Sequence, residues 1–203
     1  MTILTFPAIN YPSQLTWRLI ANTQTHRSPF DGSTQTLRMA GERWAATLTW
    51  ETLKEDDWRL LTAFVSRLGG MSGRFYYGPY HAERRATGTG TPLINDSIQT
   101  GGAISVKGWD ASAQAFKAGD FLSYNDANGR PLLHQVTADS TASGAGVATV
   151  SIAPPVRRSV ADNTPVEFAA PVAVFMLGGD DFSTTFRPGR FGATTLEIVE
   201  ALV

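Results

Sequence analysis

One segment with helical periodicity interrupts a chain of strand-like segments, and it limits the possible folds more than any other feature. Thr52 and Glu55 have the spacing of a capping box at a helix start. Apolar residues then recur at helical spacing until Gly69 and Gly70 end the pattern. They are Trp58, Leu61, Phe64, Val65 and Leu68. We therefore predict one helix of about four turns whose apolar stripe covers a sheet.

Strand-like segments come before the predicted helix. RWAATLTW (43–50) alternates so that Trp44, Ala46, Leu48 and Trp50 share one face, which commits that face to a core. QLTWRLIA (14–21) also has strand character. Residues 23–36 between them are rich in turn formers and too many for a tight hairpin, so we expect an extended loop there.

The middle of the chain differs from the first part in composition and in the spacing of its predicted strands. An aromatic strand is expected at 73–80, followed by a Gly, Thr and Ser-rich stretch at 86–102 that is typical of a linker or of an entry into a second module. From 103 to about 170 the pattern is of five short strands separated by turns. In one of these turns, Asn128 and Gly129 have the residue types for the positive φ values of a two-residue hairpin. This pattern predicts a small barrel or sandwich, with the OB-fold as one candidate.

The last segment predicts two strands, PVAVFML (171–177) and ATTLEIVEALV (193–203), joined by a loop. Two strands cannot bury themselves, so we expect them to complete the sheet of the first part of the chain. The predicted fold is mostly β: a discontinuous β-sandwich domain with one α-helix, interrupted by a small OB-like β-barrel. The expected domains are 1–88 plus 172–203, and 89–171.

Composition excludes several classes of function. The chain is 42% hydrophobic and 17% charged, as a globular protein is, and its formal net charge of −1 provides no field to attract nucleic acid as a principal partner. It has no cysteine, which rules out disulfides, thiolate metal sites and a thiol nucleophile. The N-terminal segment does not resemble a signal peptide and no run is long enough for a bilayer, so we expect a soluble protein, cytoplasmic when made.

No group of residues has the spacing of a catalytic, cofactor-binding or metal site, so we predict that the protein is not an enzyme and needs no cofactor. His26, His81 and His134 are scattered, and His134 is expected to be a partly exposed strand residue. Asp56 and Asp57 suit a helix start, and Asp180 and Asp181 suit a turn better than a metal site.

Interaction residues are a better expectation than catalytic ones. FRPGRFG (186–192) predicts a hairpin tip, which either packs back on its own domain or is reserved for a neighbour. The long loop 23–36 offers a second surface. The candidate interface residues are Arg27, Phe30, Phe186, Arg187, Arg190 and Phe191. The basic pairs Arg84–Arg85 and Arg157–Arg158 are expected to be solvated loop charges, with an interface rim as the alternative.

The order of these features resembles the distal tail proteins of long-tailed siphophages, in the two-domain type with an OB-like insertion. The resemblance covers almost the whole chain, and three stretches carry it by the pattern and order of their features. They are RWAATLTWETLKEDDWRLLTAFVSRLGGMSGRFYYGPY, KAGDFLSYNDANGRPLLHQVT with VATVSIAPPVR, and GGDDFSTTFRPGRFGATTLEIVEAL.

The resemblance implies a structural role in a virion. Such proteins form a hexameric ring that joins the tail tube to the tail-tip hub, and DNA passes through the lumen without specific binding. The expected partners are therefore further copies of the chain, the tail-tube protein and the hub protein. The inserted domain projects outward, where a tail fibre or receptor-binding protein is the expected partner, and no membrane is involved. The expected location is the tail tip, after assembly in the host cytoplasm.

A carbohydrate-binding or receptor-binding module of a virion or cell surface is the alternative. Such a module is also a β-sandwich or barrel without an active site. Exposed aromatic residues would stack on sugar rings, and the candidates are Tyr76, Tyr77, Tyr80 and Trp109. A hydrolase ranks last, because no pair of carboxylates with suitable spacing is evident.

Overall fold

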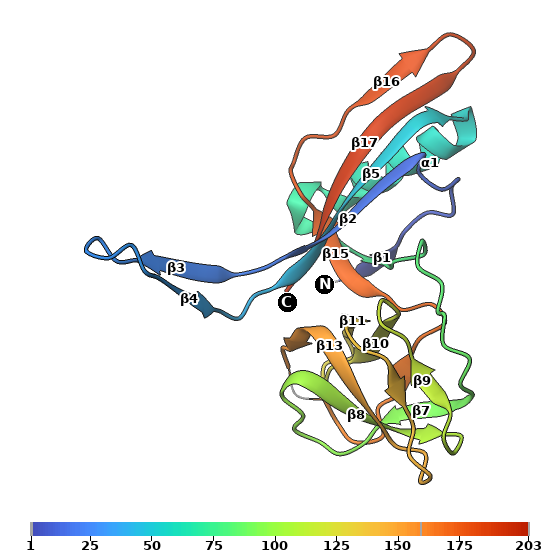
Figure 1. Ribbon diagram of the computed structural model, residues 1–203. Helices are drawn as coiled ribbons and strands as arrows, with labels where there is room; N and C mark the ends of the chain where they lie inside the picture. The colour runs from blue at the N-terminus through green and yellow to red at the C-terminus, as the bar shows by residue number, and fades with distance from the viewer. Residues whose placement is uncertain (1, 159, 203) are drawn as a thin grey trace. The chain divides into compact units, whose positions relative to one another are not determined.

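The computed structural model describes residues 2–158 and 160–202 (Figure 1). Strands dominate, and the described residues contain one α-helix and one short 3₁₀ turn, η1 (Gly70–Ser72). The predicted class is confirmed: a mostly β chain with a discontinuous, sandwich-type unit carrying one helix, interrupted by a small barrel. No helix among these residues has the length and apolar character that crossing a bilayer requires.

The chain divides into two compact units. The first contains residues 1–75 and 175–203, and the second contains residues 76–174. The chain passes from the first unit to the second within β6 (Arg74–Tyr77) and returns within β15 (Ala173–Leu177), so both unit boundaries lie inside strands. The sequence-based boundaries, 88/89 and 171/172, lie in the connecting segments outside these strands.

A seven-stranded sheet forms the first unit, in the order β1-β6-β15-β17-β5-β2, with β16 also paired to β17. Its remaining strands are β1 (Ile3–Thr5), β2 (Gln14–Ile20), β5 (Arg43–Leu53), β16 (Thr184–Arg187) and β17 (Phe191–Glu200). The two long strands at the centre are antiparallel, with Leu48 opposite Leu196 and Ala46 opposite Ile198. The prediction that the C-terminal strands join the sheet of the N-terminal segment is confirmed.

This sheet is strongly curled. Trp17 on β2 and Phe175 on β15 are separated by two intervening strands, which in a flat sheet would place them about 14 Å apart. Their ring centroids are 5.8 Å apart, and Trp17 also lies 5.7 Å from Trp44. The edge strand β2 therefore curls toward β15 over a shared aromatic core, as the two layers of a sandwich do.

The predicted helix is confirmed as α1 (Glu55–Leu68), which ends at Gly69 in the left-handed conformation with φ 64°. Its buried residues are Leu61, Phe64, Val65 and Leu68. Phe64 makes an edge-to-face contact with Phe75 of β6 at 5.4 Å, so the stripe covers the sheet as expected. The predicted capping box is wrong: Lys54 is the N-cap residue and makes no side-chain cap bond, because β5 extends to Leu53 and includes Thr52.

The expected loop at 23–36 is also wrong. Residues 23–38 form an antiparallel hairpin of β3 (Thr23–Arg27) and β4 (Thr34–Arg38), which projects from the end of β2 (Figure 1). Polar residues, mostly threonine and glutamine, form these strands without an apolar face, so the alternation that would signal a strand is missing from the sequence. We call residues 23–38 the arm.

The second unit is a nearly closed barrel, in the order β14-β10-β11-β13-β8-β7. Leu93 of β7 forms a bridge with Pro165, next to β14, and this bridge brings the two edge strands together. The strands are β7 (Gly90–Ile94), β8 (Gly101–Trp109), β10 (Phe121–Asn125), β11 (Pro131–Val136), β13 (Ala148–Val156) and β14 (Val166–Glu167). Two further short strands between these in the sequence, β9 (Gln114–Phe116) and β12 (Ser140–Thr141), pair with each other in a small separate ladder.

Of the two interpretations of residues 86–102, a linker or an entry into a second module, the structure supports the second. Ala86 is buried, and the N–H groups of Arg85 and Ala86 donate to the buried carboxylate of Asp120. Gly90 (φ 141°) opens β7, and a Cβ there would lie 2.4 Å from the carbonyl oxygen of Gly108. Glycine therefore permits close contact between two strands here, and does not mark a flexible connection.

The turn between β10 and β11 differs from the predicted two-residue hairpin. Asn125 is opposite Pro131, which leaves five residues in the loop, and of the predicted pair only Gly129 has a positive φ, of 74°. The carboxylate of Asp126 accepts the N–H groups of Asn128 and Arg130 and also binds Arg158 at 3.0 Å. Arg158 is therefore paired with a buried carboxylate and is not the solvated charge that the sequence suggested.

Candidate interaction surfaces

The six candidate interface residues lie on two hairpins of the first unit. Arg27 and Phe30 belong to the arm, whereas Phe186 and Arg187 end β16. Arg190 lies in the turn that follows, and Phe191 begins β17. The second group is brought together at one hairpin tip, as the sequence predicted, and the structure places the first group on a separate projection.

The arm has no core of its own. All ten strand residues of β3 and β4 are exposed, so neither face of this two-stranded ladder is covered. A two-stranded hairpin alone is at best marginally stable in water, and its outer edges carry unpaired backbone groups. The arm therefore has the properties of an element that becomes covered when a partner binds.

The tip of the arm is nevertheless well ordered by hydrogen bonds. The N–H of Ser28 donates to the carbonyl of Ser33 at 2.8 Å, and the carboxylate of Asp31 accepts the N–H and hydroxyl of Ser33 at 3.0 and 2.8 Å. Hydrogen bonds from Ser28 and Ser33 lower the pKa of Asp31 to about 2, so this carboxylate stays ionised. Phe30 is 98% exposed at this tip.

The C-terminal hairpin tip packs back on its own unit. The ring of Phe186 lies 4.7 Å from that of Trp58 in an edge-to-face arrangement, and the indole N–H of Trp58 donates to the carbonyl of Arg190 at 3.2 Å. The guanidinium of Arg190 binds Glu55 at 3.1 Å. Hydrogen bonds from Arg190 and then Arg59 lower the pKa of Glu55. Phe186 and Arg190 thus contact their own unit, as one of the two interpretations expects, and their side chains stay 58% and 80% exposed.

An open sheet face lies on the side opposite α1, and sequence reasoning missed it. Threonine dominates it: Thr16 is opposite Thr47, and Thr49 is opposite Thr195 with 3.4 Å between their hydroxyl oxygens. Thr185 of β16 continues the row. Charged residues of both signs share this face, and they are Arg18, Arg43, Arg187, Glu51 and Glu197. In the sequence, the threonines at alternate positions of TLTWE (47–51) could have indicated this polar sheet face.

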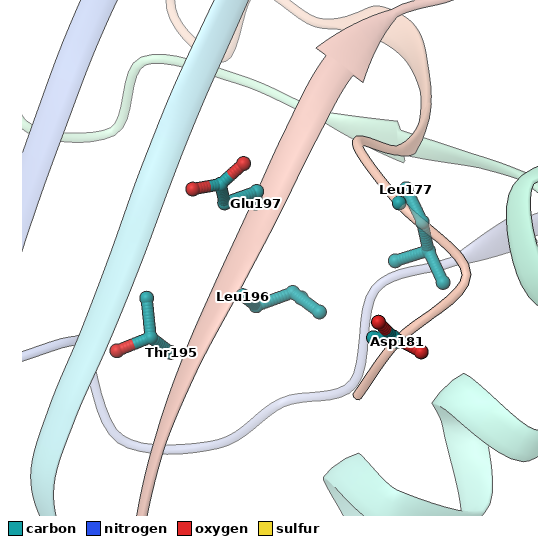
Figure 2. Close-up of a pocket in the computed structure, with 6 residues that line it drawn as sticks. Leu177, Asp181, Thr195, Leu196 and Glu197 are labelled. Atoms are coloured by element: carbon teal, nitrogen blue, oxygen red, sulfur yellow. The ribbon is translucent and has the colours of Figure 1, made fainter. Parts of the chain in front are cut away.

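Shallow hollows mark the open face. One of about 260 Å³ lies where Leu177, Gly179 and Asp181 meet β17. Figure 2 shows Thr195 and Glu197 leaving β17 on one side and Leu196 on the other, as strand geometry requires. The hollow is open to solvent.

A second hollow, the basal pocket, lies where the arm begins. Its volume is about 270 Å³. Ile20 and Arg43, which are opposite each other at the ends of β2 and β5, line it together with Arg18, Met71, Met176 and Glu197. Ile20 and Met71 are 36% and 38% exposed. The lining of the pocket thus combines apolar side chains with charged groups of both signs.

Titratable residues show structural roles. Within residues 2–158 and 160–202, no three His, Asp or Glu side chains gather in a manner that would hold a metal ion. Asp180 accepts the N–H of Met71 at 2.9 Å, which fits the predicted turn. The expected exposure of His134 is wrong: the ring is fully buried, stacks on Tyr124 at 5.1 Å and lies 2.7 Å from the carbonyl of Pro154.

The sugar-stacking surface expected under the alternative function is not formed by Trp109. This residue is 5% exposed, and the guanidinium of Arg84 lies 5.2 Å from its ring and 4.4 Å from the ring of Phe168. Arg84 also donates to the carbonyls of Gly88 and Ala115. The prediction that Arg84 is a solvated charge is therefore wrong, and Tyr77 is buried too, whereas Tyr80 is 38% exposed.

Comparison of the chain with protein-family models gave no match, and comparison with curated proteins gave none either. The resemblance to distal tail proteins therefore stays a prediction.

Proposed function

We propose that this protein is a structural component of a phage or prophage tail tip, of the distal tail type. Copies of the chain form a ring, hexameric in the resembling family, which joins the tail tube to the tail-tip hub. The ring's lumen continues the DNA channel. The protein catalyses no reaction and its activity is assembly.

The arm is the observation that supports this proposal most directly. Ten strand residues with no covered face argue for a partner, and a projection on one side of a subunit gives a contact between different surfaces of neighbouring copies. Contacts of that head-to-tail kind generate closed rings when the rotation between neighbours closes. A monomeric enzyme or binding module has no need of such an element.

The open sheet face suits the wall of a DNA channel. Its threonines are uncharged, and its three arginines share it with two glutamates, which reduces its attraction for a phosphate backbone. The formal charge of the whole chain, −1, agrees with a conduit along which DNA slides. In a ring built from the first unit, we place the threonine-rich part of this face, outside the basal pocket, toward the lumen and α1 away from it.

The barrel unit is proposed as the attachment domain. It is a separately packed unit with its own core, and its inward-facing residues include Ile104, Val106, Phe116, Leu122 and Val150. A tail fibre or receptor-binding protein is the proposed partner. The carbohydrate-binding alternative loses its main residue, because Trp109 is buried under Arg84.

Two experiments test the proposal. Electron microscopy of negatively stained, concentrated protein is expected to show ring-shaped particles with a central hole. Mixing with tail-tube protein is expected to place these rings at the tube ends. Single globular particles in both preparations would contradict the proposal.

A further inference from the structure

The arm tip and the basal pocket have complementary shapes and charges, although both belong to the same chain. The tip presents the aromatic ring of Phe30, 98% exposed, between Arg27 and the ionised Asp31. The lining of the pocket combines the apolar side chains of Ile20, Met71 and Met176 with two arginines and a glutamate. An exposed aromatic residue and an open apolar hollow both lose unfavourable contact with water when they meet.

The size of the pocket fits one aromatic ring. Its volume is about 270 Å³, and a cavity of about 150 Å³ in another protein is known to hold benzene. Two of the lining residues are methionines, whose flexible thioether side chains adapt to an aromatic ring and attract it. The tip itself is fixed by the hydrogen bonds of Asp31 and Ser28, so little conformational entropy is lost when it docks.

The charges are arranged for the same contact. Asp31 would face Arg18 or Arg43, and Arg27 would face Glu197. Arg18 lies on β2 and Arg43 on β5, whereas Glu197 lies on β17, the next strand of the sheet. Opposite charges at separate places favour one orientation of the docked tip over the reversed one.

A chain cannot fill its own pocket. The ladder from the pair Thr23–Arg38 to the pair Arg27–Thr34 covers four residue steps, or about 14 Å, and the tip lies beyond it. The pocket lies at the opposite end, where Ile20 and Arg43 pair. An intact arm therefore holds Phe30 away from the pocket of the same chain.

We propose that Phe30 of one copy docks in the basal pocket of a second copy, in a head-to-tail contact. The arm has Phe30 at its tip and the basal pocket at its base. Each copy therefore inserts its own Phe30 into one neighbour and accepts the Phe30 of another. This inference rests on the proposed ring and names the residues that close it.

Cross-linking tests the contact directly, because the chain has no cysteine of its own. Pro29→Cys chains, which keep Phe30, are mixed with size-tagged Ser72→Cys chains, which keep Met71, and treated with a short bismaleimide; Pro29 and Ser72 are both exposed. We expect a cross-linked heterodimer at least tenfold more abundant than with Ser66→Cys chains, because Ser66 is exposed on α1, on the other side of the sheet. Equal yields with the Ser72→Cys and Ser66→Cys chains would overturn the proposal.

Substitutions provide a second measurement. Phe30→Ala is expected to raise the concentration at which half the chains assemble by at least tenfold, whereas Leu37→Ala, which removes a 60% exposed apolar residue in the middle of the arm, changes it less than threefold. Asp31→Arg is expected to weaken assembly, and Arg43→Glu in the same chain to restore part of it. Equal effects of Phe30→Ala and Leu37→Ala would contradict docking of Phe30.

The outcomes also separate this inference from the proposed function. Rings that form while the Pro29→Cys and Ser72→Cys chains give no cross-linked product would overturn the contact and leave the ring proposal intact. A chain that stays monomeric at every concentration, and gives no such product, would overturn both.

Discussion

The guanidinium of Arg190 donates a hydrogen bond to a carboxylate oxygen of Glu55 at 3.1 Å, which ties the C-terminal hairpin to the first residue of the single helix. Three residues further along α1, Trp58 supports the same hairpin with its ring and its indole N–H. The acidic start of the helix thus receives a cation from a segment 135 residues away in the sequence. The ion pair is exposed, so we attribute most of the attachment to Trp58.

Replacing Trp58 should release this hairpin. Trp58→Ala removes the edge-to-face contact with Phe186, a kind of contact that stabilises by about 0.5 to 1.5 kcal/mol beyond its buried area. We expect faster amide hydrogen exchange at residues 184–191, measured by mass spectrometry, with exchange in the barrel unchanged. Arg190→Gln is the matched control and should give a smaller increase. Equal exchange in wild type and Trp58→Ala would contradict the attachment.

The helix start offers a gain in stability. Lys54 has the extended conformation of an N-cap residue, with φ −67° and ψ 162°, but makes no side-chain cap bond. Lys54→Asp should supply that bond and stabilise the first unit by about 1 kcal/mol, measured by chemical denaturation. Thr52→Ser lies in β5 and should have no capping effect. A loss of stability in Lys54→Asp would show that this helix start is misassigned.

Arg84 should be important for the barrel. Its guanidinium lies within 5.7 Å of three aromatic ring centroids, and it binds two backbone carbonyls. Arg84→Met keeps the length but removes the charge and leaves those carbonyls without a donor, so we expect a loss of roughly 2 to 4 kcal/mol. Arg84→Lys should recover only part of it, because lysine lacks the planar fork. An unfolding curve unchanged by Arg84→Met would contradict this role.

His134 should make the barrel sensitive to acid. Burial lowers its pKa to about 3, while the pKa of histidine in an unfolded chain is about 6.5. The folded state therefore disfavours the proton: stability is complete above pH 6.5 and falls as the pH drops toward 3, by up to about 1.4 kcal/mol per pH unit. The measurement is the melting temperature between about pH 7 and pH 4.5, above the range where most carboxylates titrate.

His134→Gln is the control for this acid sensitivity. Glutamine retains a donor for the carbonyl of Pro154, to which the histidine Nδ1–H donates, but it does not titrate. The pKa of His81 is also lowered by desolvation, so the informative quantity is the difference between wild type and His134→Gln. Melting temperatures that fall in parallel with pH in both proteins would exclude His134 as the cause.

The sequence predicted those elements whose apolar residues follow a regular period. The stripe of α1 and the alternation in β5 were visible because each buries one side on the core. The arm was missed for the same reason: its strands bury nothing, so threonine and glutamine give no period. The helix cap was misplaced because β5 continues through Thr52, where strand pairing with the rest of the sheet overrides a local capping motif.

Side-chain environments were harder to predict than elements. Nothing local in LLHQV distinguishes a buried histidine from an exposed one, because burial depends on Tyr124 and Pro154 from other strands. The position of Arg84 likewise depends on aromatic residues 25 or more positions away. The interface candidates Phe30 and Phe186 were found by residue type, but their different surroundings, one exposed and one packed on Trp58, depend on the tertiary fold.

The mass of the protein in solution tests the central claim most directly. Sedimentation velocity across a wide concentration range is expected to show a discrete species at about six times the 21.9 kDa chain mass, with few intermediates, because a head-to-tail ring gains its last contact only on closure. A chain that sediments as a monomer at every concentration, with tail-tube protein present or absent, would contradict the account.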